Sequence, residues 1–303
     1  MKALASFVMR GPSQSAMATT VLTMLALIFP FVGILGSACV GLVFLRLGMM
    51  AGVKTLLLST LAVGLLMGVV FGNPLPALGI LLVAWLPIGL LGMLLRNTHS
   101  LGLTTQAGIG FGLLAIVLQY VVLGQPKVFW REYLQPMGQS FVEAGLLDQA
   151  QSLPVIEQVS GVMCGVVAVL FLLQLLCSLY LARWWQAVLY NPGGFAGEYR
   201  QLRVHWMVGL VGVLALPALL MPGEGGPAFF LCLGAVFLGV LFLQGLAVVH
   251  GVFKGLKSVQ LWLVLTYLLL IVFMPQMVLV LTGIGLTDVW IDYRTRFKDK
   301  PSG

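Results

Sequence analysis

Long apolar stretches without a charged residue recur along the chain and dominate its pattern. No Asp, Glu, Lys or Arg occurs within 55–95, 158–182, 206–223, 225–253 or 258–287. A helix needs about 20 mainly apolar residues to cross a hydrocarbon core about 30 Å thick. Repeated charge-free stretches of this length have no explanation in a soluble domain. The pattern therefore predicts an all-α fold, a polytopic bundle of transmembrane helices.

We expect about eight helical segments within a single integral membrane domain that covers residues 1–303. They run over 17–45, 55–71, 78–95, 101–123, 155–182, 206–220, 228–252 and 261–286. The first is interrupted at Pro30 and the last at Pro275, because proline removes a backbone donor and clashes inside a helix. If each terminal segment crosses once, both basic termini lie outside. If each folds back at its proline, both lie inside, and we favour this form for the C-terminal segment.

Lysine and arginine are distributed unevenly between the short loops. Basic loops lie at 46–54, at 96, at 183–205 and at 254–257, whereas the loops around 73 and 224 hold no Lys or Arg. Positive residues are retained on the cytoplasmic side. We therefore expect the turn 183–205, the tail 287–303 and both termini in the cytoplasm, and the loop 124–154 outside. The net charge of +7 follows from this distribution and does not indicate a nucleic-acid partner.

Aromatic and apolar side chains recur at helical spacing in the outer loop 124–154. They are Phe129, Trp130, Tyr133, Leu134, Met137 and Phe141, with charged residues between them. This pattern is typical of an amphipathic helix that lies in the membrane interface with its rings at headgroup depth. A lid over a substrate site is the alternative.

Residues that could carry catalysis are scarce. The three histidines are scattered, and the sequence has no HExxH, no phosphate-binding loop and no nucleophile elbow. The four cysteines lie in apolar segments without metal-ligand spacing, so we interpret them as small buried apolar residues. The sequence predicts no enzyme, no metal site, no cofactor and no ATPase.

Neutral polar residues inside the apolar segments are the candidates for ligand binding. They are Trp85, Gln119, Gln174 and Gln244. One interpretation is a pocket for an uncharged or amphiphilic ligand, and the other is hydrogen bonding between helices, since a buried amide in lipid needs a partner. A transport subunit should enclose a pocket lined by these residues, whereas a scaffold should bury the amides against each other.

Two segments on the basic side form the second group of candidates. The first is the turn Asn191, Pro192, Gly193, Gly194 and Phe195, followed by Arg200 and Arg203, and the second is the tail with Asp288, Trp290, Asp292 and Arg294. On a helix Asp288, Asp292 and Arg296 would lie on one face. If the chain folds back at Pro275, Asp288 and Asp292 can pair with Arg200 and Arg203 and dock the tail on the turn. The alternative is an ordinary basic loop, with each arginine bound to lipid phosphate.

These two segments also carry a resemblance. The Asn-Pro-Gly-Gly-Phe turn, followed by Glu198 and Leu202-Arg203, and the closing Asp-x-Trp-x-Asp-x-Arg resemble the YybS-like family of predicted bacterial membrane proteins. That family is distantly similar to the S subunits of energy-coupling-factor transporters and to the rod-shape protein MreD. The resemblance implies the bacterial inner membrane, and the S-subunit likeness implies a neutral outer pocket and partners that supply ATP hydrolysis. The extra spans and the long outer loop depart from the S subunits and place ligand capture in doubt.

The function that we predict is a transport-related, solute- or lipid-binding membrane subunit without its own ATPase. The alternative is a non-catalytic membrane scaffold for assembly of the cell envelope. The expected partners are membrane lipid and either partner membrane subunits or a cytoplasmic ATPase. The ligand and the oligomeric state stay open.

Overall fold

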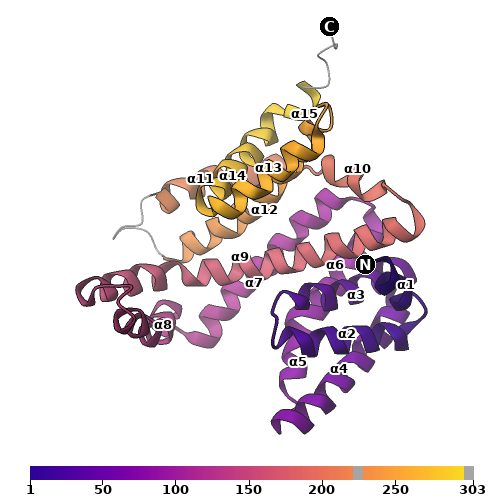
Figure 1. The fold of residues 1–303 in the computed structure, drawn as a ribbon, viewed down its shortest axis with the longest axis horizontal. Coiled ribbons are helices and arrows are strands. Elements are labelled where there is room, and N and C mark those ends of the chain that lie inside the picture. The colour runs from indigo at the N-terminus through magenta and orange to yellow at the C-terminus, as the bar shows by residue number, and fades with distance from the viewer. Residues whose placement is uncertain (221–227, 297–303) are drawn as a thin grey trace. The chain divides into compact units, whose positions relative to one another are not determined.

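The computed structural model describes residues 1–220 and 228–296, and the elements in them are all helical (Figure 1). The first half of the chain contains α1 (Lys2–Val8), α2 (Pro12–Ala26), α3 (Val32–Leu47), α4 (Met49–Phe71), α5 (Pro76–Ile80), the π-helix η1 (Leu81–Trp85), α6 (Leu86–Thr98), α7 (Leu101–Leu123) and α8 (Pro126–Glu143). The second half contains α9 (Gln149–Tyr190), α10 (Gly194–Arg200), α11 (Trp206–Leu220), α12 (Ala228–Phe253), α13 (Val259–Val272), α14 (Met274–Ile291) and α15 (Tyr293–Arg296).

The prediction of a polytopic helical membrane protein is confirmed. Within the described residues, 6 helices are long and apolar enough to cross a membrane. They are Met49–Phe71, Pro76–Thr98, Leu101–Leu123, Gln149–Tyr190, Phe229–Phe253 and Met274–Ile291, with shorter apolar helices at Val32–Leu47, Trp206–Ala215 and Val259–Val272. Both expected interruptions are present: Pro30 lies between α2 and α3, and Pro275 follows the break between α13 and α14.

The boundaries of α9 differ from those expected for the fifth segment. This helix extends over 42 residues, which corresponds to about 63 Å at 1.5 Å per residue. It therefore begins within the expected outer loop and continues through residues 183–190 of the expected cytoplasmic turn. Charge-free stretches mark the part of a helix that lies in hydrocarbon, not the polar turns that continue it on either side.

Packing divides the chain into two compact units, which we call unit 1 and unit 2. Unit 1 consists of Met1–Gly108 and Leu173–Leu202, and unit 2 consists of Ile109–Leu172 and Arg203–Gly303. The boundary between them falls within α7 and within α9.

Helix α3 is the centre of unit 1. Its residues 36–45 are buried without exception, and it packs against α2, α4 and α6. Glycines of two neighbouring helices make room for the Phe44 ring. A Cβ at Gly52 would approach that ring to 2.6 Å, and a Cβ at Gly89 to 2.8 Å.

On α4 the opposite face is apolar and exposed at Leu57, Leu61 and Leu65, as expected for a helix whose outer side meets lipid.

Helix α12 is the centre of unit 2 and packs against α11 and α14. Helices α12 and α14 run in opposite directions, because Leu241 lies against Gly285 while Gly245 lies against Leu281. At this crossing a Cβ on Gly245 would overlap the carbonyl oxygen of Leu281, and a Cβ on Gly285 would overlap that of Leu241. Small residues at such a contact let two backbones approach closely, which is how helices without a hydrophobic drive to associate gain packing energy.

We predict that Gly245→Ala and Gly285→Ala each destabilise the protein, by about 1–3 kcal/mol or more, because the added methyl group forces α12 and α14 apart. The measurement is thermal unfolding of the purified protein in mild detergent. Gly283→Ala is the matched control on α14, since a Cβ there meets nothing within 4 Å. Equal effects of Gly285→Ala and Gly283→Ala would contradict the close backbone contact.

Candidate functional site

A cavity of about 570 Å³ opens in unit 1 among the ends of four helices. It is lined by Leu45 and Arg46 of α3, Leu95, Arg96 and Asn97 of α6, the following His99, Arg183 and Gln186 of α9, and Glu198 of α10. Three of these side chains are arginines, and one is a carboxylate. The cavity therefore combines a basic, hydrogen-bonding wall with the apolar ends of two membrane helices.

Two sharp changes of chain direction place the arginines. Gly48 ends α3 with φ +87°, and His99 ends α6 with φ +52°, conformations that stop a helix within one residue. Arg46 and Arg96 thus lie in the last turns of their helices, where cations are favoured by the helix dipole. The Arg46 guanidinium lies 4.3 Å from the centroid of the Tyr190 ring, and the Arg96 guanidinium packs against Gly48.

The third arginine of the cavity is neutralised. Arg183 donates from Nε to Glu198 at 2.9 Å and from Nη2 to the other carboxylate oxygen. This two-pronged pair is the strongest geometry available to an arginine and a carboxylate. Arg46 and Arg96, in contrast, form no ion pair with any carboxylate of residues 1–220 and 228–296. The cavity consequently keeps a net positive charge.

The turn that follows α9 positions Glu198 beside Arg183. Asn191 directly follows the last residue of α9. Its carbonyl accepts a hydrogen bond from the Gly194 amide at 3.0 Å, and Gly193 adopts φ +86°. Phe195 then stacks on Tyr199 with ring centroids 5.8 Å apart. The motif from Asn191 to Phe195 therefore forms the turn between α9 and α10 and the first residues of α10, and Pro192 lies within this turn. Arg200 ends α10 in unit 1.

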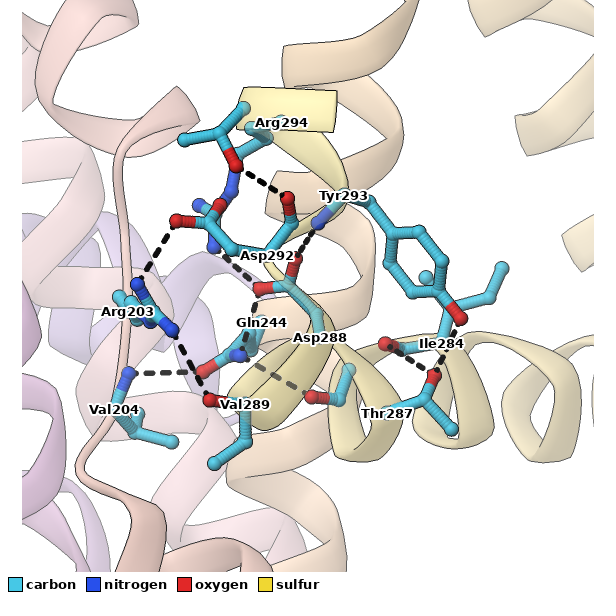
Figure 2. A network of polar contacts seen from close by, with 12 residues as sticks. Arg203, Val204, Gln244, Ile284, Thr287, Asp288, Val289, Asp292, Tyr293 and Arg294 are labelled. Carbon is cyan, nitrogen blue, oxygen red and sulfur yellow. Dashed lines mark hydrogen bonds and ion pairs between the residues drawn. The ribbon is translucent and has the colours of Figure 1, made fainter. Parts of the chain in front are cut away.

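A buried polar network occupies unit 2 (Figure 2). Asp288 and Gln244 are both 0% exposed. Gln244 accepts a hydrogen bond from the Val204 amide at 2.9 Å, and its Nε2 donates to the Gly285 carbonyl at 3.1 Å and to Asp288 at 3.0 Å. Asp288 also accepts from the Tyr293 amide at 3.0 Å and from Nη2 of Arg294 at 2.5 Å. One carboxylate thus connects α12, α14 and the tail.

A second ion pair closes this network nearer the surface. Arg203 donates to Asp292 at 2.9 Å and to the Val289 carbonyl at 3.1 Å, as Figure 2 shows. Asp292 directly follows α14 and has φ +49°, a conformation that aspartate tolerates better than most residues. The chain therefore turns back at Asp292, and this turn brings Arg294 onto Asp288.

The expected pairing of Asp288 and Asp292 with Arg200 and Arg203 is present in part. Arg203 pairs with Asp292, whereas Asp288 pairs with Arg294 of the tail itself. The expected helical row of Asp288, Asp292 and Arg296 is wrong, because the helix ends at Ile291. Trp290 is 51% exposed, and its ring lies against Gly209 of α11.

The four residues considered for ligand binding lie in different surroundings. Trp85, on the π-helix, is 1% exposed, and Gln174 is exposed near Gly33; both belong to unit 1. In unit 2 the Gln119 amide donates to the Cys164 carbonyl at 3.1 Å and accepts from Nε1 of Trp130 at 3.3 Å. The Gln244 amide is bonded entirely within the network described above. None of the four lines either of the cavities described here.

The loop expected outside the membrane forms helix α8, which is attached to the start of α9. Glu157 of α9 pairs with Lys127 at 2.6 Å and with Arg131 at 3.7 Å. Phe129, Tyr133, Met137 and Phe141 are exposed on α8, which fits a helix at a membrane interface. A cavity of about 580 Å³ beside α8 is lined by Arg131, Glu132, Gln135, Leu153, Pro154, Ile156 and Glu157. Its lining carries both signs of charge, with the Glu157 carboxylate already paired.

Comparison with known proteins identifies the family. Residues 17–289 match the family model described as predicted membrane protein, DUF2232. The chain belongs to the DUF2232 family of predicted membrane proteins. No curated protein and no solved structure matches the chain. The likenesses to the YybS-like family, to transporter S subunits and to MreD gain no support from these comparisons.

Sequence reasoning missed the basic cavity, although it used the same residues. Arg46, Arg96 and Arg183 served only to orient the loops, and Glu198 served only as part of a motif. Two arginines in the last turns of helices are the one local signal that could have marked the site. In the part of the chain that the structure describes, no group of three or more His, Cys, Asp or Glu side chains is placed to hold a metal ion.

The two ion pairs of Figure 2 differ in burial, and we predict that they differ in the stability they provide. Arg294 and Asp288 are 10% and 0% exposed, whereas Arg203 and Asp292 are 46% and 26% exposed. Asp288→Ala should cost about 3–5 kcal/mol, because it removes one charge of a buried, hydrogen-bonded ion pair and leaves the other buried. Asp292→Asn keeps the turn conformation and should cost about 1 kcal/mol or less. Thermal unfolding in detergent provides the comparison.

The double variant Asp288→Ala with Arg294→Met is the control for this interpretation. It removes both charges, so it should recover part of the stability lost in Asp288→Ala. A double variant that is less stable than the single one would mean that the two side chains do not act as a pair.

Proposed function

We propose that this membrane protein binds a phosphate-bearing lipid of the cytoplasmic leaflet, as a transport-related subunit that has no ATPase of its own. The observation that carries the proposal is the cavity at Arg46 and Arg96. Its volume of about 570 Å³ falls within the ~300–1,000 Å³ of ordinary small-molecule sites. It is large enough for a headgroup.

Charge selects the ligand class. The Arg46 and Arg96 guanidinium groups line the cavity and pair with no carboxylate of the described residues. Arginine binds phosphate through two parallel hydrogen bonds. Asn97 and Gln186 add neutral donors and acceptors for glycerol or sugar hydroxyls. The apolar Leu45 and Leu95 begin the surface along which acyl chains would continue. A free anion would make no use of that apolar surface.

The position of the cavity along the membrane supports the same ligand. Arg46 and Arg96 belong to the loops that the positive-inside rule assigns to the cytoplasm, and the cytoplasmic leaflet is the one rich in anionic lipid. In this proposal the protein lies in a bacterial inner membrane with its basic loops facing the cytoplasm. Any step driven by ATP would belong to a partner, since the sequence has no phosphate-binding loop.

A scaffold without a ligand is the second candidate, and one observation favours it. The amides of Gln119 and Gln244, which a neutral pocket would use, are bonded to protein atoms instead. Such amides hold helices together and leave nothing for a solute. The two candidates differ in whether the arginine cavity retains lipid.

The test compares lipid retention in native mass spectra of the protein purified in mild detergent. We predict that Arg46→Gln with Arg96→Gln loses the anionic phospholipid that the unmodified protein retains, because no guanidinium remains to bind the phosphate. The control is Arg10→Gln with Lys54→Gln, which removes the same charge from unit 1 at exposed residues outside the cavity. Equal retention by both double variants would reject the lipid site and leave the scaffold.

A further inference from the structure

Two rows of hydroxyl groups are buried inside unit 1, away from the arginine cavity. Ser15 and Thr19 lie one turn apart on α2, and Thr55 and Ser59 lie one turn apart on α4. All four side chains are 0% exposed. Helices α2 and α4 pack directly against each other, so the two rows lie on the buried faces of two neighbouring helices.

None of these four hydroxyl oxygens has a hydrogen-bond partner, and the same holds for Thr20 and Thr60 beside them. Hydroxyls elsewhere in the chain behave differently. Thr105 donates to the Leu101 carbonyl and Ser178 to the Gln174 carbonyl, each at 2.7 Å. Those bonds to the preceding turn are the usual way in which serine and threonine are satisfied within a helix. The buried hydroxyls of Ser15, Thr19, Thr55 and Ser59 make no such bond.

Leaving these groups unpaired would be costly. A buried hydroxyl without a partner costs about 1–3 kcal/mol, and hydrocarbon offers no hydrogen bond in compensation. Four such groups, buried on two helices that pack against each other, therefore require a partner other than the protein atoms that the structure describes. A hydroxyl both donates and accepts, and the buried residues of α2 and α4 include no charged side chain. A small neutral molecule that also donates and accepts fits these requirements.

We propose that α2 and α4 enclose a file of bound water molecules, held by Ser15, Thr19, Thr55 and Ser59. Buried waters usually bridge polar groups that have no other partner. Here they would join the two hydroxyl rows and connect α2 to α4. Val63 continues the α4 row by one turn and is apolar and 0% exposed, so the hydrated seam ends between Ser59 and Val63.

The test uses the reactivity of cysteine toward a small water-soluble reagent. Ser59→Cys and Val63→Cys are prepared in the full chain, reconstituted in lipid nanodiscs and treated with 2-aminoethyl methanethiosulfonate, with adducts mapped by mass spectrometry. Because the thiolate is the reacting form and needs water to exist, Ser59→Cys should react about ten times faster than Val63→Cys, or more. Equal rates, or no reaction at either position, would overturn the proposal.

A second measurement does not depend on cysteine. Thr19→Val and Thr55→Val remove a hydroxyl while nearly preserving shape. If the seam holds water, each change removes a hydrogen-bond partner of the bound water molecules and lowers the unfolding temperature. If the seam is dry, removing an unpaired hydroxyl is neutral or stabilising. Unchanged or raised unfolding temperatures in both variants would therefore also overturn the proposal.

Discussion

The absence of water from hydrocarbon is the constraint on which this structure depends. A polar group buried in a membrane protein must find its partner among protein atoms or bound molecules. Asp288 shows how completely one site meets this requirement, since it accepts hydrogen bonds from Gln244, from the Tyr293 amide and from Arg294. Those donors come from α12 and from α15, while Asp288 itself lies on α14. Satisfying one carboxylate thereby fixes α12, α14 and the tail relative to each other.

The same constraint gives the two units different chemistry. In unit 2 the glycine contact between α12 and α14 brings the backbones close enough for the Gln244 amide to reach the Gly285 carbonyl. Close packing and hydrogen bonding therefore support each other there, and no polar atom of Gln244 is left for a ligand. In unit 1, Arg46 and Arg96 lie at helix ends beside a cavity, and in the proposed function a lipid phosphate would accept their hydrogen bonds.

The features that depend on the free energy of transfer from water to hydrocarbon could be predicted from the sequence. The features that depend on how the helices pack against each other could not. Charge-free stretches located the membrane helices, and Pro30 and Pro275 marked the interruptions. The partners of Gln244 could not be predicted, because Val204 lies 40 residues and Asp288 44 residues away along the chain, and only the packing brings them to the amide. Likewise, Arg46, Arg96 and Arg183 converge from three distant segments. The row of Asp288, Asp292 and Arg296 failed for a local reason, since one left-handed residue ended the helix.

The acidic residues near the basic loops decide how much positive charge remains for lipid. Each described carboxylate of the turn 183–205 and the tail is paired with an arginine: Glu198 with Arg183, Asp288 with Arg294 and Asp292 with Arg203. Those three arginines hold helices and turns together, and a neighbouring carboxylate neutralises the charge of each. Arg46 and Arg96 keep theirs. Among the described residues, the arginines of these loops thus divide into a set paired with carboxylates, which holds helices and turns in place, and the pair Arg46 and Arg96, which in the proposed function would bind lipid phosphate.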